Sequence, residues 1–214
     1  MDLKRIYSKI FAWMGLGLLI TFLTGYLISM NDTLLYNIFG KNFYWIFVIA
    51  ELAVVIFLTA RLRKMQPATA TICFLLYSFL TGVTFSSIFV VYKMESILLV
   101  FLISAFLFTL FALIGRYTKL DLTKIGTYLF MGLIGILICT IINLLLKNTM
   151  FDFIITCISL ILFLGYTAYD IQKVKKLCYQ IGDEHKLCIL GALELYLDFI
   201  NIFLDLLRIM GDSD

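Results

Sequence analysis

The sequence has few charged residues, one proline and one histidine, and these scarcities narrow the class of protein. Only 14% of the 214 residues are charged, whereas soluble domains carry about 25%. Hydrophobic residues make up 63% of the chain, so it is too apolar for a soluble globular protein. The net charge of +3 is small and gives no indication of nucleic-acid binding.

The cysteines show no pattern of a metal site or of a disulfide framework. No CxxC pair occurs, and each cysteine lies in or beside an apolar run, so we interpret all of them as small buried residues. They are Cys73, Cys139, Cys157, Cys178 and Cys188. The sequence also contains no nucleophile–base pair and no phosphate-binding glycine loop. It therefore predicts a protein that is not an enzyme and that needs no cofactor.

Long apolar runs dominate what the chain does contain. In lipid, only helices and closed barrels satisfy every backbone polar group, and these runs are too long for barrel strands. Seven stretches approach the roughly 20 residues of a membrane-spanning helix: 10–29, 43–60, 71–92, 96–115, 125–146, 153–170 and 187–207. The first resembles a signal peptide, but no cleavage site is evident and we expect it to be retained. The connections are short, so we predict an all-α integral membrane protein with one transmembrane domain over residues 1–214.

Lysine and arginine are distributed unevenly between the two ends of the predicted spans. If the N-terminus is cytoplasmic, thirteen basic residues lie on the inside and three, Lys41, Lys93 and Lys147, lie outside. Such an excess marks the cytoplasmic side of a membrane protein. The sequence therefore predicts a multi-pass protein of the cell membrane with a cytoplasmic N-terminus. It leaves the side of the C-terminus open, because the last helix could either cross the membrane or re-enter.

Acidic residues inside the predicted spans are the main functional signal, because a charge in hydrocarbon is expensive. The clearest examples are Glu51, Asp170 and Asp198. The last span also carries a polar stripe, with spacings of 4, 3 and 4 that place its members on one helical face. These are Glu194, Asp198, Asn201 and Asp205. This face must meet protein or water, and the apolar remainder indicates a central place for the last helix.

Asp170 and Asp198 stand at equal distances from the turn that joins the last two predicted helices. The midpoint between them is position 184, and each lies fourteen residues away. In an antiparallel hairpin they reach similar depth if the sixth helix continues to about Tyr179. Lys173, Lys175 and Lys176 would then extend to the cytoplasmic surface. Two carboxylates at close range in a low dielectric cannot both stay charged, so the pair should share a proton and titrate as a unit.

A calcium ion could take the place of the shared proton. Calcium prefers about six to eight oxygen ligands. Asp170 and Asp198, with neighbours such as Asn201 and Thr167, supply too few for tight binding. The sequence therefore predicts a weak calcium site at the two aspartates, suited to transit.

A packing role is the alternative for each intramembrane acid, because an aspartate can bond a polar group on a neighbouring helix. We favour it for Asp205, because Arg208 follows three residues later and the two could form an ion pair at the helix end. For Glu194, the functional role and the packing role are equally supported. Glu51 could line an ion path or pair with a basic residue.

Three segments resemble the transmembrane Bax-inhibitor-motif family (Bax inhibitor-1 family) in its bacterial form: "LYLDFINIFLDLLRIMG", "GYTAYDIQKVKK" and "KMQPATATICFLLYSFLTGVTFSSIF". The resemblance implies seven helices, with the last one central and surrounded by the other six. It also implies a pH-sensitive calcium leak whose paired-aspartate sensor maps onto Asp170 and Asp198. An arginine latch at the inner end of the second helix is implied as well. Its expected position falls between Arg61 and Arg63, so either could serve, and Glu194 is an acid beyond the family pattern.

Together these features predict a calcium leak channel gated by Asp170 and Asp198, with Glu51, Asn201 and Glu194 along the ion path. Its expected partners are calcium, protons and the lipid bilayer, with protein partners left open. One alternative is a proton-coupled cation transporter, which should show internal repeats and broken helices. No clear repeat is visible, and we place the single proline, Pro67, in a loop. The other alternative is a non-transporting regulator that binds membrane proteins through its helices.

Overall fold

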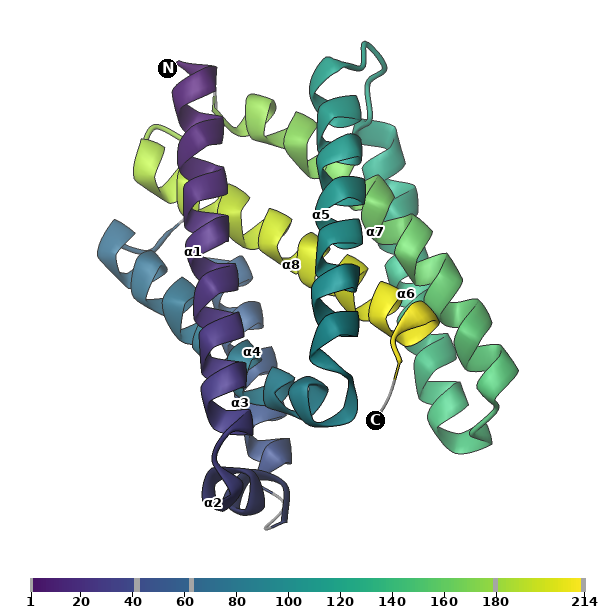
Figure 1. Cartoon of the computed structure of the whole chain (residues 1–214). Helices are drawn as coiled ribbons and strands as arrows, with labels where there is room; N and C mark the ends of the chain where they lie inside the picture. The colour runs from purple at the N-terminus through teal and green to yellow at the C-terminus, as the bar shows by residue number, and fades with distance from the viewer. Residues whose placement is uncertain (1, 41–42, 62–63, 179–180, 213–214) are drawn as a thin grey trace. The chain divides into compact units, whose positions relative to one another are not determined.

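The protein is helical throughout the part described by the computed structural model, which covers residues 2–40, 43–61, 64–178 and 181–212. These residues form helices joined by short connections, with no β-strand among them (Figure 1). The long helices are α1 (Leu3–Ser29), α3 (Tyr44–Arg61), α4 (Pro67–Val91), α5 (Met94–Tyr117), α6 (Thr123–Leu146), α7 (Thr149–Leu177) and α8 (Glu184–Met210). The predicted all-α fold class is confirmed.

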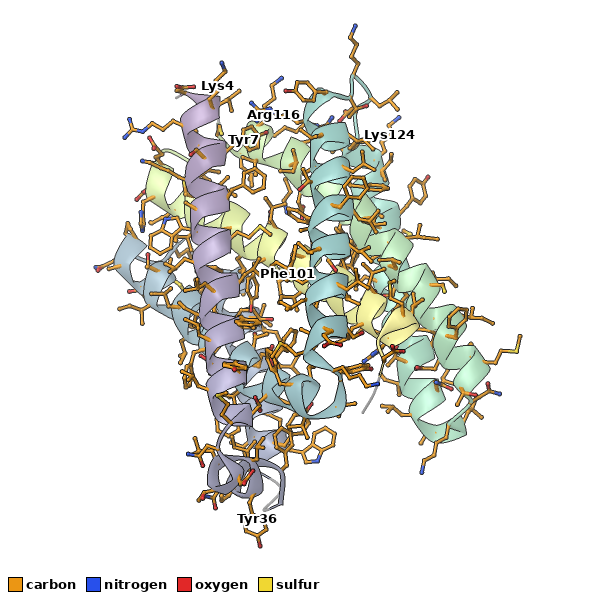
Figure 2. The ribbon with its side chains drawn as sticks, in the orientation of Figure 1. Lys4, Tyr7, Tyr36, Phe101, Arg116 and Lys124 are labelled. Atoms are coloured by element: carbon orange, nitrogen blue, oxygen red, sulfur yellow. The ribbon has the colours of Figure 1, made fainter. Side chains whose placement is uncertain are left out.

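Each predicted span coincides with one of these long helices, and the structure supports six or seven spans where the sequence predicts seven. Six of the helices are individually long and apolar enough to cross a membrane, or seven if α3 is counted with the short helical segment before it. That segment, α2 (Asp32–Leu35) followed by the π-helical turn η1 (Tyr36–Gly40), was not predicted. The Tyr36 side chain on it is 66% exposed and points away from the helices (Figure 2).

Local capping groups decide where several helices begin. The Asp2 side chain accepts a hydrogen bond of 3.0 Å from the backbone N–H of Lys4, which starts α1. The backbone N–H groups of His185 and Lys186 donate to Asp183 in the same way at the start of α8. Pro67 is the first residue of α4 and does not lie in a loop as predicted. Proline suits this position because the first turn of a helix needs no N–H donor.

The chain forms two compact units. Among the described residues, unit 1 comprises residues 2–93 and 177–196, and unit 2 comprises residues 94–176 and 197–212. Helix α8 therefore contributes its first half to unit 1 and its second half to unit 2. The single transmembrane domain expected from the sequence stays a prediction.

In unit 1, α1 and α4 pack closely where both present small residues. A Cβ atom added to Gly25 would lie 3.1 Å from the carbonyl oxygen of Gly82, and one added to Gly82 would lie 2.8 Å from that of Thr21. Small residues bring helix backbones together in this way in membranes. Helix α3 packs against the same α4, which makes α4 the shared partner in this unit.

The N-terminal ends of α1, α4 and α8 meet at one end of unit 1. The Glu184 carboxylate lies 2.6 Å from the Lys9 ammonium and 3.7 Å from the Arg5 guanidinium. The Thr71 hydroxyl lies 2.8 Å from Nε2 of His185. This is the end at which the sequence predicts the cytoplasmic surface.

In unit 2, the connection between α5 and α6 is held against the last turns of α7. The Gln172 side chain donates to the carbonyl of Leu120 and accepts from the N–H of Leu122, both at 2.8 Å. The Lys176 ammonium lies 2.8 Å from Asp121, and it holds the pKa of that carboxyl below its usual range together with Thr123.

Basic residues gather at this same end of unit 2. Arg116 lies in the last turn of α5 and Lys124 in the first turn of α6. Both are found at the end where the two helices are joined (Figure 2). Lys175 and Lys176 lie in the last turn of α7. The positive charges that the sequence assigns to the cytoplasm are therefore grouped at one end of this unit also.

Helix α8 is the most buried of the candidate spans. In its most apolar 18-residue window, 78% of the residues are buried, compared with 6% in α6. The central place expected for the last helix stays a prediction. The five cysteines are free thiols, and only Cys188 is buried. The prediction that all of them are buried is wrong for the other four, which are half-buried.

Candidate functional site

The two aspartates of the predicted sensor are both buried in unit 2. Asp170 on α7 is 6% exposed, and Asp198 on α8 is 4% exposed. Helix α7 runs on past Asp170 to Leu177, so the predicted extension of the sixth helix is confirmed to within two residues. The extension matters because it sets Asp170 two turns inside the end of the helix.

Lys173 makes a contact with Asp170 that the sequence did not predict. Its ammonium lies 3.5 Å from Oδ1 of Asp170, and its side chain is 31% exposed. It also lies 5.7 Å from the centre of the Tyr169 ring. A lysine three residues after an acid on a helix is within reach of it, so the spacing contained this signal. Asp170 therefore has a positive charge beside it on its own helix.

Tyr166 connects the two aspartates electrostatically and was missed by the sequence analysis. It lies one turn before Asp170 on α7. Its phenol interacts electrostatically with Asp170, Asp198 and Lys173. Tyr166 is therefore near enough to interact with both carboxyl groups and with the ammonium, while the sharing of a proton between Asp170 and Asp198 stays a prediction.

The other oxygen groups considered as calcium ligands are engaged with their own helices. The Asn201 amide donates to the carbonyl of Leu197 at 2.7 Å, and the Thr167 hydroxyl donates to that of Phe163 at 3.0 Å. Within the described ranges, no group of three or more His, Cys, Asp and Glu side chains is placed to hold a metal ion. A calcium site at Asp170 and Asp198 would therefore rest on two carboxyl groups and water.

Glu51 of α3 lies in unit 1 and is bound by hydroxyl groups of α4. Thr81 donates to Oε1 at 2.8 Å, and Thr84 donates to Oε2 at 3.1 Å. Tyr77 is a further hydrogen-bond partner. In the described part of the chain, the partners of Glu51 are hydroxyls and not the basic residue that the sequence analysis considered. The spacing of Tyr77, Thr81 and Thr84 on one face of α4 was the available signal.

The hydroxyl groups around Glu51 continue into a buried network in unit 1. Tyr196 of α8 is fully buried, and its hydroxyl lies 2.6 Å from that of Thr21 on α1. Thr81 is also a hydrogen-bond partner of Tyr196. The network thus links α3, α4, α8 and α1 through hydrogen bonds between polar side chains.

The remaining predicted site residues have less defined surroundings. Arg61 is the last residue of α3, and its side chain is exposed. Arg63 lies outside the described residues, so the arginine latch stays a prediction. Glu194 lies on the part of α8 assigned to unit 1 and is half-buried, one turn before Asp198.

A comparison with protein families identifies the chain. The profile of the family described as inhibitor of apoptosis-promoting Bax1 matches residues 3–214. The chain belongs to the Bax inhibitor-1 family. This confirms the resemblance carried by the motifs around Asp170 and Asp198.

Relatives in the Bax inhibitor-1 family include several bacterial membrane proteins. The inner membrane protein YbhL of Escherichia coli K12 is 41% identical over 98% of this chain and 92% of its own length. A Borreliella burgdorferi protein is 38% identical, over 97% of this chain and 92% of its own length. A Streptococcus pyogenes serotype M1 membrane protein is 34% identical, over 99% of this chain and 94% of its own length. With the apolar helices, these matches support a multi-pass membrane protein.

Proposed function

We propose that this Bax inhibitor-1 family protein lets calcium leak passively across the cell membrane and that Asp170 and Asp198 sense pH. The observation that carries the proposal is the pair of buried aspartates in one neighbourhood with Lys173 and Tyr166. Intramembrane acids are costly and mark ion or proton pathways in membrane proteins. Glu51, Asn201 and Glu194, which precedes Asp198 by one turn of α8, are further oxygen groups proposed for the path.

The balance of charges explains why such a site responds to both protons and calcium. Two carboxylates and one ammonium are neutral together when the pair holds one proton. Loss of that proton leaves one net negative charge in a medium of low dielectric, where charges interact strongly. The site then attracts a cation, and two carboxyl groups with water bind calcium weakly enough to release it. Proton loss and calcium entry are thereby linked.

The proposed orientation places the N-terminus in the cytoplasm. In unit 1, the N-terminal ends of α1, α4 and α8 lie together with Arg5 and Lys9. In unit 2, the ends of α5, α6 and α7 lie together with Lys124 and Lys176. Both groupings support the cytoplasmic side inferred from the excess of basic residues.

The test is calcium influx into liposomes that contain the purified protein and a trapped calcium dye. We expect influx that follows the calcium gradient, needs no proton gradient, and changes between mildly acidic and mildly basic pH. Liposomes without protein give the background. Saturable uptake that depends on an imposed proton gradient would instead indicate the proton-coupled transporter. No influx at any pH, together with a co-purifying membrane protein, would indicate the non-transporting regulator.

Replacing Lys173 by glutamine should move the pH dependence of influx to higher pH. Removing the ammonium 3.5 Å from Asp170 makes loss of the shared proton harder, so the midpoint should rise by about one pH unit. Lys175→Gln is the matched control, because Lys175 lies on the same helix with an exposed side chain. Equal pH midpoints of calcium influx for Lys173→Gln and Lys175→Gln would show that Lys173 does not act on the aspartate pair.

A further inference from the structure

Asp205 is a second buried acid in unit 2, separate from the Asp170–Asp198 pair. It lies on α8 and is 6% exposed. Its Oδ2 atom is buried without a hydrogen-bond partner among the described residues. A carboxyl oxygen left in this way costs free energy, because burial removes its water without replacing the hydrogen bonds.

The ion pair expected for Asp205 is not present. No ion pair joins Asp205 to Arg208 among the described residues, and the Arg208 side chain is exposed, so its charge acts only from a distance. The side-chain partner of Asp205 is the hydroxyl of Ser159 on α7, which is itself 6% exposed. Arg208 acts on Asp205 through its charge alone, and a hydroxyl cannot neutralise a carboxylate.

The position of Asp205 relates it to the sensor. It follows Asp198 by seven residues, which is two helical turns or about 10 Å along α8 on the same face. Ser159 precedes Asp170 on α7, and Asp205 follows Asp198 on α8, both in the direction away from the basic ends of these helices. Helices α7 and α8 therefore carry polar groups at two levels, the aspartate pair and the Asp205–Ser159 pair.

We propose that Asp205 and Ser159 form a second cation-binding station, which takes calcium before or after the aspartate pair. The inference rests on the proposed calcium leak and adds a second site to its path. The unpartnered Oδ2 atom and the Ser159 hydroxyl supply two oxygen ligands, and water that enters together with the cation supplies the rest that a hard divalent cation needs. Such a site binds weakly and exchanges quickly, as a transit site must.

A purely structural role makes a different prediction. If the Asp205–Ser159 bond only fixes α7 against α8, then removing the carboxylate charge while keeping its shape should leave calcium binding unchanged. An apolar residue at this position should in that case be tolerated, because the unpaired Oδ2 atom is removed with the carboxylate.

The experiment is a calcium titration of the protein in liposomes, followed by infrared difference spectroscopy of the carboxyl bands and by dye influx. We expect a calcium-induced carboxylate signal that Asp205→Asn removes in part. The calcium concentration for half-maximal influx should rise about tenfold with Asp205→Asn and about threefold with Ser159→Ala, on the scale of one lost charge or hydrogen bond. The pH midpoint of influx should stay that of the parent protein, because the aspartate pair is intact.

Two variants keep the test decisive. Asp205→Glu retains the carboxylate and should restore much of the infrared signal. Such a result would also exclude a general folding defect as the cause of the loss in Asp205→Asn. Asp152→Asn removes an exposed acid from the first turn of α7 and should behave as the parent protein. An unchanged infrared signal in Asp205→Asn would contradict the proposal that Asp205 and Ser159 bind a cation. If the parent protein shows no influx, the leak fails, while loss of the infrared signal in Asp205→Asn still supports calcium binding at this site.

Discussion

Calcium influx is expected to lose its pH dependence when either Asp170 or Asp198 is replaced by asparagine. Each substitution removes one of the two carboxyl groups that share a proton, and Lys173 then neutralises the one that remains. The site no longer changes charge across the neutral range, so a curve that varies severalfold with pH should become flat. Because the two groups titrate as a unit, the double variant should add little to either single one.

The measurement is dye influx into liposomes at matched protein density across the pH range. Asp121→Asn is the control, because Asp121 is an exposed acid of the same unit outside the helices, and exposed ion pairs contribute little. Influx in the double variant that keeps the pH profile of the parent protein would remove the aspartate pair from gating. The two residues would then be regarded as packing groups.

Replacing Gly115 by alanine is expected to destabilise the fold more than any other glycine-to-alanine change in unit 2. Gly115 on α5 faces the backbone of Ala168 on α7, where an added Cβ would overlap the carbonyl oxygen and lie 2.7 Å from Cα. A backbone cannot move aside as a flexible side chain can. Overpacking of this kind costs about 1–3 kcal/mol, and the thermal unfolding temperature in detergent should fall by several degrees.

Gly135→Ala is the matched control, because no neighbouring atom lies within 4 Å of a Cβ added at this position on α6. Its stability should be unchanged or slightly raised, since alanine favours helix over glycine. Gly115→Ala should also disturb the pH profile of influx, because Ala168 stands two residues before Asp170 on α7. Equal unfolding temperatures for the two variants would show that α5 and α7 do not approach closely at Gly115.

Tertiary structure decided which partners the acidic side chains meet. Glu51 meets Thr81 and Thr84, because α3 and α4 are rotated to bring those faces together. Asp205 meets Ser159 on α7 and not Arg208 on its own helix, because the arginine side chain extends outwards. Helical spacing says which residues share a face, but it does not set how two helices are rotated against each other.

The sequence by itself determined the helices and the location of the acids. Long apolar runs must form helices in lipid because every backbone polar group has to be satisfied within the segment, and each predicted span is a helix in the structure. The equal spacing of Asp170 and Asp198 from the turn, and the polar stripe on α8, follow from helical geometry in the same way. The packing around them was decided by tertiary structure alone. The close approach at Gly115, the hydroxyl network of Glu51 and the burial of Asp205 all depend on contacts between segments far apart in the chain.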